Sequence, residues 1–114
     1  MKLKIIKELL QCTPFYESND LLEEEFDDVC GSDLMSDVLA FVKGKCLLMT
    51  GLINGQVIRT AEMMDIKAVV IVRGKRPTSE MIQLARDKNI AIYNTHLTMY
   101  QACGILYSNG LGVR

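Results

Sequence analysis

The chain contains no tryptophan, only two prolines and a single histidine, His96. Its apolar stretches fall well short of the roughly 20 residues that a membrane-spanning helix requires. The first ten residues interleave lysines with apolar residues and show no small-residue cleavage site. We therefore expect neither a signal peptide nor membrane attachment, and a cytoplasmic location.

Paired cysteine motifs are also missing. The four cysteines, Cys12, Cys30, Cys46 and Cys103, include no CxxC pair. A four-ligand zinc site would need nearly all of them to converge beside His96, so we expect no metal. Disulfides are not expected in a chain without an export signal. We interpret the thiols as small hydrophobic groups.

No strong excess of one charge is present, since the formal net charge is −1. The two signs are nevertheless unevenly distributed. Residues 1–45 hold five lysines and ten acidic residues, whereas residues 46–114 hold eight basic and four acidic residues. These runs are either simply solvated or attract one another, within one chain or between copies. The basic excess is too small, and too poor in aromatic neighbours, to indicate nucleic-acid binding.

The hydrophobic pattern alternates short apolar runs with segments of helical spacing. It predicts a helix over residues 2–10, a brief strand at 15–16, a turn at 19–20 and an extended edge over 25–30. A helix follows, with Ser32 as N-cap, Asp33 at its first position and a broad apolar face from Leu34 to Val42, and it closes at residues 43–45. Strands are predicted at 46–50, 68–72 and 90–93, with helices at 57–65, 78–88 and a last one capped by Thr95.

This alternation predicts an α/β fold, a three-layer α/β/α sandwich whose mainly parallel sheet has four to five strands. At 114 residues the chain forms one domain, which we place at residues 1–108, followed by a flexible tail at 109–114.

Ligands of open parallel sheets bind outside the carboxyl ends of the strands. That rule selects Thr50, the basic loop Arg73-Gly74-Lys75-Arg76, and Thr95 with His96. The basic loop combines a glycine with three cations just before a helix, which is suited to an anion. The alternatives are an exposed, solvated loop or a contact with acidic residues.

Asp33 and Asp37 would lie one helical turn apart, with Ser32 and Ser36 beside them. A cation such as Arg73 or Arg76 could neutralise this pair and connect the helix to the basic loop, so Ser32, Ser36 and Asp37 are supporting candidates. The alternative, which we favour for both aspartates, is a solvated helix start.

No catalytic set is visible. The sequence contains neither GxxxxGK[ST] nor GxGxxG, and Cys103 falls in the middle of a helix, where a thiol is normally inert. We therefore expect no catalytic residues, no cofactor and no enzyme activity. An enzyme that uses His96 with Thr50 or Thr95 remains a third possibility, which requires all three to share a pocket.

Three parts of the sequence resemble the DRTGG-domain family: the segment GSDLMSDV at residues 31–38, the strand 68–72 with Gly74 and Arg76-Pro77 behind it, and Asn94-Thr95 with the helix ending at Tyr107. The resemblance covers nearly the whole chain and looks closest to the small stand-alone members. It implies an α/β/α domain similar to the N-terminal domain of HPr kinase/phosphorylase. Such domains also occur inside phosphotransacetylases and next to CBS pairs, as regulatory or ligand-sensing modules without catalytic residues.

The chain departs from the motif that names this family. Residues 73–75 read Arg-Gly-Lys where Thr-Gly-Gly is expected, and Gly55-Gln56 or Ile58-Arg59 replaces Asp-Arg. The resemblance then implies a site altered toward a more anionic ligand.

The sequence thus favours a regulatory domain that binds a small anion or nucleotide at the basic loop and acts as a homodimer or with a partner protein. The alternative is an interaction module, again a homodimer or partner-binding protein, with no small-molecule ligand.

Overall fold

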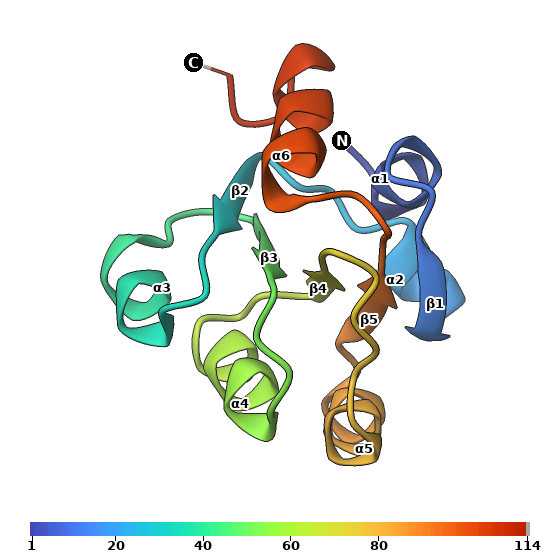
Figure 1. Ribbon diagram of the computed structural model, residues 1–114, viewed down its shortest axis with the longest axis vertical. Helices are drawn as coiled ribbons and strands as arrows, with labels where there is room; N and C mark the ends of the chain where they lie inside the picture. The colour runs from blue at the N-terminus through green and yellow to red at the C-terminus, as the bar shows by residue number, and fades with distance from the viewer. Residues whose placement is uncertain (114) are drawn as a thin grey trace.

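Five strands form one sheet in the order β1-β5-β4-β3-β2 in the computed structural model, which describes residues 1–113 (Figure 1). The strands β2 to β5 are mutually parallel, and β1 pairs with β5 in the antiparallel direction. Their bounds are β1 Thr13–Tyr16, β2 Asp28–Gly31, β3 Cys46–Thr50, β4 Ala68–Ile71 and β5 Ala91–Asn94.

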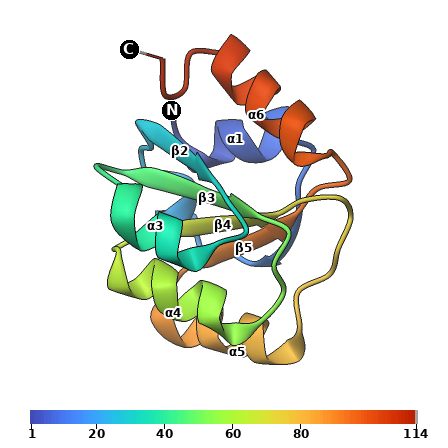
Figure 2. The ribbon, with the colours of Figure 1, turned by 60° about the vertical axis from the view of Figure 1, so that its left-hand side comes forward.

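Helices cover both faces of this sheet. Figure 2 shows α1 and α6 on one side and α3, α4 and α5 on the other, which confirms the predicted three-layer sandwich. The helices are α1 Leu3–Leu9, α2 Asn19–Leu22, α3 Met35–Phe41, α4 Gly55–Met63, α5 Ser79–Lys88 and α6 Met99–Ser108. None of the helices within residues 1–113 is long and apolar enough to cross a membrane.

The central strands are buried over their whole length. Successive side chains of a strand point to opposite faces, so Leu47 and Met49 pack beneath α1 and α6, whereas Leu48 packs against α3 and α4. This two-sided burial explains why residues 46–50 and 68–71 read as continuous apolar runs.

Local caps fix the ends of the later helices. Asn54 caps α4, Thr78 caps α5, and Asn89 ends α5 in the left-handed conformation. The predicted cap of the last helix was wrong: Thr98, and not Thr95, caps α6, through a capping box with Gln101. Thr95 is instead buried, and its hydroxyl donates to the carbonyl of Leu10.

The N-terminal third differs more from expectation. The turn predicted at Asn19-Asp20 is the start of α2, capped by Ser18. The predicted start of the next helix at Ser32-Asp33 was also wrong, because the N–H of Ser32 still donates to Met49 in β3. α3 therefore begins only at Met35 and ends at Phe41, before the lysines and Gly44 that were expected to close it.

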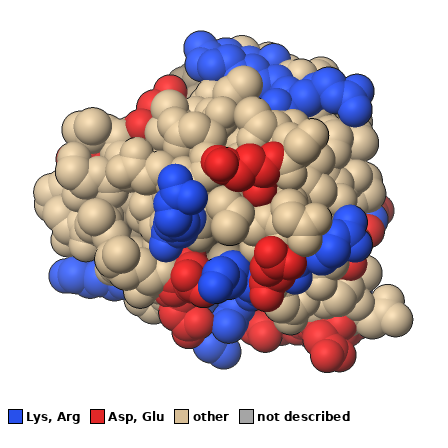
Figure 3. All heavy atoms as spheres, turned by 90° about the horizontal axis from the view of Figure 1, so that it is seen from below, with Lys and Arg blue, Asp and Glu red and all other residues tan. Residues whose placement is uncertain are grey.

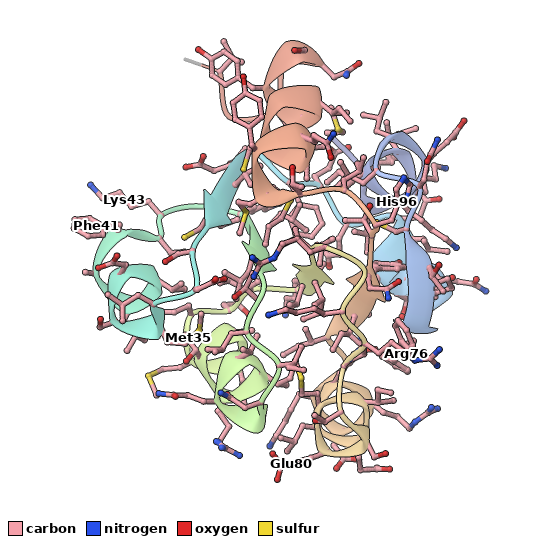
Figure 4. All side chains as sticks on the ribbon, viewed as in Figure 1. Met35, Phe41, Lys43, Arg76, Glu80 and His96 are labelled. Carbon is pink, nitrogen blue, oxygen red and sulfur yellow. The ribbon has the colours of Figure 1, made fainter. Side chains whose placement is uncertain are left out.

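The apolar face expected on α3 is only partly buried. Met35 and Val38 pack in the core, whereas Leu34, Leu39 and Phe41 are exposed by 58%, 44% and 73%. Figure 4 shows Phe41 directed away from the sheet.

One residue of the segment predicted as a tail, Leu111, belongs to the core. Leu111 is buried against the face of the sheet that α1 and α6 cover. The domain boundary at residue 108 and the flexible tail at 109–114 stay predictions, and Arg114 lies outside the described residues.

Within residues 1–113, no ion pair closer than 4 Å joins the acidic N-terminal stretch to the basic C-terminal stretch. Among residues 1–113 the ion pairs within 4 Å join residues of the same stretch, as in Lys2 with Glu23, Lys7 with Glu17 and Lys88 with Glu62. On the face seen in Figure 3, acidic and basic atoms are intermixed over the centre, while Lys and Arg atoms gather along the upper edge.

Candidate functional site

The site lies where the chain leaves the carboxyl ends of β2, β3 and β4. Asp33 follows β2, Gly51 follows β3, and Arg73 and Lys75 follow β4. Because these strands are parallel neighbours, their three loops meet at one edge of the sheet. This is the edge at which open parallel sheets bind ligands.

Asp33 organises this edge. Its Oδ1 accepts hydrogen bonds from the backbone N–H of Gly51, at 2.6 Å, and from the hydroxyl of Thr50, at 3.1 Å. The N–H of Gly51, followed by the Thr50 hydroxyl and the charges of Arg73 and Lys75, lowers the pKa of the Asp33 carboxyl, against the opposing effect of partial burial. Asp33 is therefore an ionised side chain that joins the β2 and β3 loops, contrary to the solvated helix start that we favoured.

Gly51 is the point at which the charged groups converge. A Cβ placed on Gly51 would lie 2.7 Å from Nη2 of Arg73 and 3.4 Å from Oδ1 of Asp33. The carbonyl of Gly51 accepts a hydrogen bond of 2.8 Å from Nζ of Lys75. Two cations thus gather around one carboxylate, which leaves this cluster with a formal charge of +1.

The backbone of the basic loop is held in an unusual conformation. Arg73 and Gly74 both have positive φ angles, 63° and 68°. Their N–H groups donate to the carbonyls of Leu97 and Thr95, which binds the loop to the segment between β5 and α6. A left-handed arginine is unfavourable, so these contacts are what hold it.

A surface cavity of about 490 Å³ opens beside this cluster. Ser32, Asp33 and Arg73 line it from the strand ends, and Thr98, Met99 and Tyr100 line it from the start of α6. Within residues 1–113, no hydrogen bond uses the N–H of Met99 or Tyr100. The residues that line the cavity therefore include an arginine, a serine and a threonine, and two residues with unused backbone N–H groups at the positive end of a helix dipole.

Other predicted site residues lie elsewhere. The side chain of Arg76 lies over the ring of Phe15 at 5.6 Å, and Figure 4 shows it beside β1. Thr95 is bound to Leu10, and the exposed His96 lies toward α1. The cavity is not lined by Thr50, Thr95 or His96, so the shared pocket that the enzyme alternative requires is not formed here.

The supporting residues divide in the same way. Ser32 lines the cavity, and its hydroxyl accepts from the N–H of Leu34. Ser36 and Asp37 are exposed on α3 and do not line the cavity. The carboxylate that faces the basic loop belongs to Asp33 and not to Asp37.

The positions that replace Asp-Arg of the family motif also lie apart from this cavity. Gly55 begins α4, where the carboxylate of Glu80 and the guanidinium of Arg59 both approach it closely. Ile58 is buried in the core.

Sequence reasoning missed the contribution of α6. With Thr95 as the predicted cap, the N-terminus of the last helix was placed three residues too early, because Thr98 is the observed cap. The pattern Thr-x-x-Gln at 98–101 is a capping-box signature that could have placed the helix start correctly.

Burial raises the pKa of all four cysteine thiols, to about 12 for Cys12 and Cys46. This keeps them protonated, in agreement with their interpretation as small hydrophobic groups. Within the described part of the chain, no three His, Cys, Asp or Glu side chains are grouped so that they could hold a metal ion.

Comparisons with known proteins give a fold relationship. No family model matches the chain, and no curated protein matches it in sequence. Among solved structures, the chain is similar to the CBS and DRTGG domains of the regulatory region of Clostridium perfringens pyrophosphatase, complexed with its activator diadenosine tetraphosphate. The TM-score is 0.73 at 15% sequence identity, and the match covers 92% of this chain and 45% of that one.

The chain thus spans less than half the length of that regulatory region. The similarity expected with the N-terminal domain of HPr kinase/phosphorylase stays a prediction. What the comparison establishes is the fold, which is similar to that of a CBS and DRTGG regulatory region.

Proposed function

We propose that this chain is a non-enzymatic regulatory domain that binds a small phosphate-bearing anion, such as a nucleotide, in the cavity beside Arg73. The observation that carries the proposal is that Arg73, Met99 and Tyr100 line one cavity at the carboxyl edge of the sheet, and that no hydrogen bond within residues 1–113 uses the N–H of Met99 or Tyr100. A phosphate group accepts from both kinds of donor.

The electrostatic balance supports an anion despite the carboxylate in the cavity wall. Oδ1 of Asp33 is engaged by Gly51 and Thr50, and Arg73 and Lys75 together exceed its charge by one unit. The aromatic ring of Tyr100, 88% exposed at the edge of the same cavity, offers a surface on which a base can stack.

The structural neighbour supports the same proposal at the level of function class. The pyrophosphatase region is regulatory, and its structure contains a dinucleotide activator. By analogy, we assign the present domain a sensing role without assigning it that activator.

Isothermal titration calorimetry with AMP, ATP, diadenosine tetraphosphate and inorganic phosphate would test the proposal. We expect at least one of these to bind, and Arg73→Ala to weaken binding by roughly 10- to 100-fold, as the loss of a charged hydrogen bond worth about 1.5–3 kcal/mol predicts. Arg76→Ala is the matched control, because Arg76 belongs to the same loop but lies over Phe15. Absence of binding, or equal loss in the two variants, would contradict the proposal.

The non-enzymatic part has its own test. Nucleotide incubated with the protein should be recovered chemically unchanged, as judged by phosphorus NMR. Turnover that is lost in His96→Ala would support the enzyme alternative instead.

We also propose self-association as part of the regulatory role, with cytoplasmic location as a further expectation. The second candidate function, an interaction module without a ligand, is favoured by the exposed tyrosines of α6. It predicts association in which none of the nucleotides has an effect.

A further inference from the structure

The outer face of α6 carries a stripe of two tyrosines separated by a glycine. Tyr100, Gly104 and Tyr107 follow one another at intervals of four and three residues, which places them on the same side of the helix. Tyr100 is 88% and Tyr107 64% exposed. A Cβ placed on Gly104 would meet no atom within 4 Å, so the space above the glycine is open.

This stripe borders a groove of about 760 Å³, which Leu97, Cys103 and Ile105 also line. None of the groove's lining residues is charged, and α6 contains no charged residue along its whole length. The other helices of the sandwich carry charged side chains, for example Lys4 and Glu8 in α1 and Glu80 and Arg86 in α5. The uncharged surface is therefore a property of α6 and not of the molecule as a whole.

We propose that the α6 groove is the interface with a second copy of this chain, in which α6 packs antiparallel against its symmetry mate with the twofold axis near Gly104. In that arrangement the two glycines allow the helix backbones to approach closely. Tyr100 of each copy then lies against the end of the stripe that contains Tyr107 of the other. The surface is self-complementary, as an isologous interface requires.

Charge selects a copy of this chain over other partners. Desolvating an unpaired charge is costly. A second α6 has no charged residue, so its packing in the groove would bury no charge. A charged peptide or an acidic partner would find no counter-charge among the residues that line the groove.

The available area is consistent with a weak dimer. A fully exposed tyrosine presents roughly 200 Å², so the two tyrosines at 88% and 64% exposure contribute roughly 300 Å² per protomer. With the flanking residues, the total for two copies approaches the ~1,000 Å² at which specific interfaces begin. The dissociation constant should therefore be on the order of micromolar.

Tyr100 borders both this groove and the cavity beside Arg73. A second copy on α6 would accordingly lie next to the proposed ligand site. The interface itself does not depend on that site, because it rests on the exposed stripe alone.

Sedimentation velocity over about 1 µM to 1 mM protein tests the interface. We expect the wild-type chain to dimerise and Gly104→Arg to weaken dimerisation at least tenfold. Arginine fits the open space in the monomer and favours the helix more than glycine does, so the variant should melt at an unchanged or higher temperature. Tyr107→Gln is a second variant on the same stripe and should also weaken the dimer.

The matched control is Ala40→Arg, the same new charge on the exposed side of α3. α3 presents the rival apolar surface, with Leu34 and Phe41 exposed, but Asp37 lies on the same helix. We expect Ala40→Arg to dimerise like the wild type. Dissociation by Ala40→Arg but not by Gly104→Arg, or a monomer at every wild-type concentration, would overturn the proposal.

Salt distinguishes this interface from one formed by the acidic and basic stretches. An uncharged interface should associate equally well at about 50 mM and about 500 mM salt. Association that is lost at the higher concentration would overturn the proposal in favour of charged surfaces.

Discussion

The two faces of the sheet are built by different means. Beneath α3, α4 and α5 the core consists of aliphatic side chains and methionine, such as Leu48, Ile71 and Met81. Beneath α1 and α6 the core also contains polar groups that reach across the chain. The Tyr93 hydroxyl donates to Glu17, and the Thr95 hydroxyl donates to Leu10.

This difference follows from the connections between the elements. α3, α4 and α5 each join two adjacent parallel strands, so chain connectivity already places them against the sheet. α1 and α6 come from opposite ends of the chain. The bonds of Tyr93 and Thr95 span 76 and 85 residues and fix the N-terminal segment beside β5.

The largest loss of stability is expected for a substitution in the aliphatic core beneath α3, α4 and α5. Ile71→Ala removes a fully buried side chain and should cost about 3 kcal/mol of unfolding free energy. Because no titrating group is involved, the loss should be equal at neutral and acid pH, as measured by urea denaturation. Met63→Ala is the control on α4: its side chain is 73% exposed, and we expect a change within about 0.5 kcal/mol. A loss of stability in Ile71→Ala that depends strongly on pH would contradict the distinction between the two faces.

The stability contributed by the face beneath α1 and α6 should depend on pH. Burial opposes ionisation of Glu17, but hydrogen bonds from Lys7 and Tyr93 outweigh it and lower the Glu17 pKa. A carboxyl with a lowered pKa stabilises the fold above its ordinary pKa, and that contribution is lost as the pH falls through the lowered value. Glu17→Gln should therefore flatten the acid side of the stability profile measured by urea unfolding.

Tyr93→Phe examines the same contact from the other side, and it should cost about 1–2 kcal/mol at neutral pH. Tyr16→Phe is its control, because the Tyr16 hydroxyl donates to Asn89 at an exposed position. Equal losses in the two tyrosine variants would argue against a special role for the buried contact.

Substitutions of Asp33, at the carboxyl ends of the strands, should have a smaller effect on stability. Asp33→Ala leaves the N–H of Gly51 without its acceptor and should cost about 1 kcal/mol. Asp33→Asn keeps an oxygen acceptor and should cost less. The Asp33 pKa is lowered, so the difference between aspartate and asparagine should vanish as the pH falls through that value. A larger cost for asparagine than for alanine would rule out this reading of the contact.

The smallest effect concerns the backbone of Arg73. Its φ of 63° favours glycine. Arg73→Gly should therefore be more stable than Arg73→Ala by about 0.5–1 kcal/mol, as measured by thermal unfolding. Equal stabilities would mean that the loop relaxes once the guanidinium is removed.

Residues with local signals were predicted well. The strand at 46–50 is recognisable because it is buried on both faces, and the helix predicted at 78–88 corresponds closely to α5 at Ser79–Lys88. Such signals depend on neighbours only a few residues away, and the C-terminal two-thirds of the chain is rich in them.

Residues whose partners lie far away in the chain were not predicted. Ser32-Asp33 reads locally as a helix start, but the backbone of Ser32 continues the pairing with β3, and the side chain of Asp33 binds Gly51 instead. Thr95 has the chemistry of a cap, but its hydroxyl is used by Leu10. A local pattern shows which hydrogen bonds a side chain can form, but it does not show which distant group becomes its partner in the folded chain.

The candidate site stays a prediction, and the sequence placed only some of its geometry. The predicted carboxyl ends of the strands pointed to the loop that contains Arg73 and Lys75, whereas the positions of Arg76 over Phe15 and of Tyr100 at the cavity depend on tertiary contacts.

The sequence by itself determined the layers, the parallel strands and the position of the basic loop, because hydrophobic periodicity and helix caps act between near neighbours. Only the tertiary structure decided that Asp33 faces Arg73, that α6 begins at Met99 and that its uncharged stripe remains uncovered. Those outcomes depend on contacts between distant segments, which form only when the whole chain is packed.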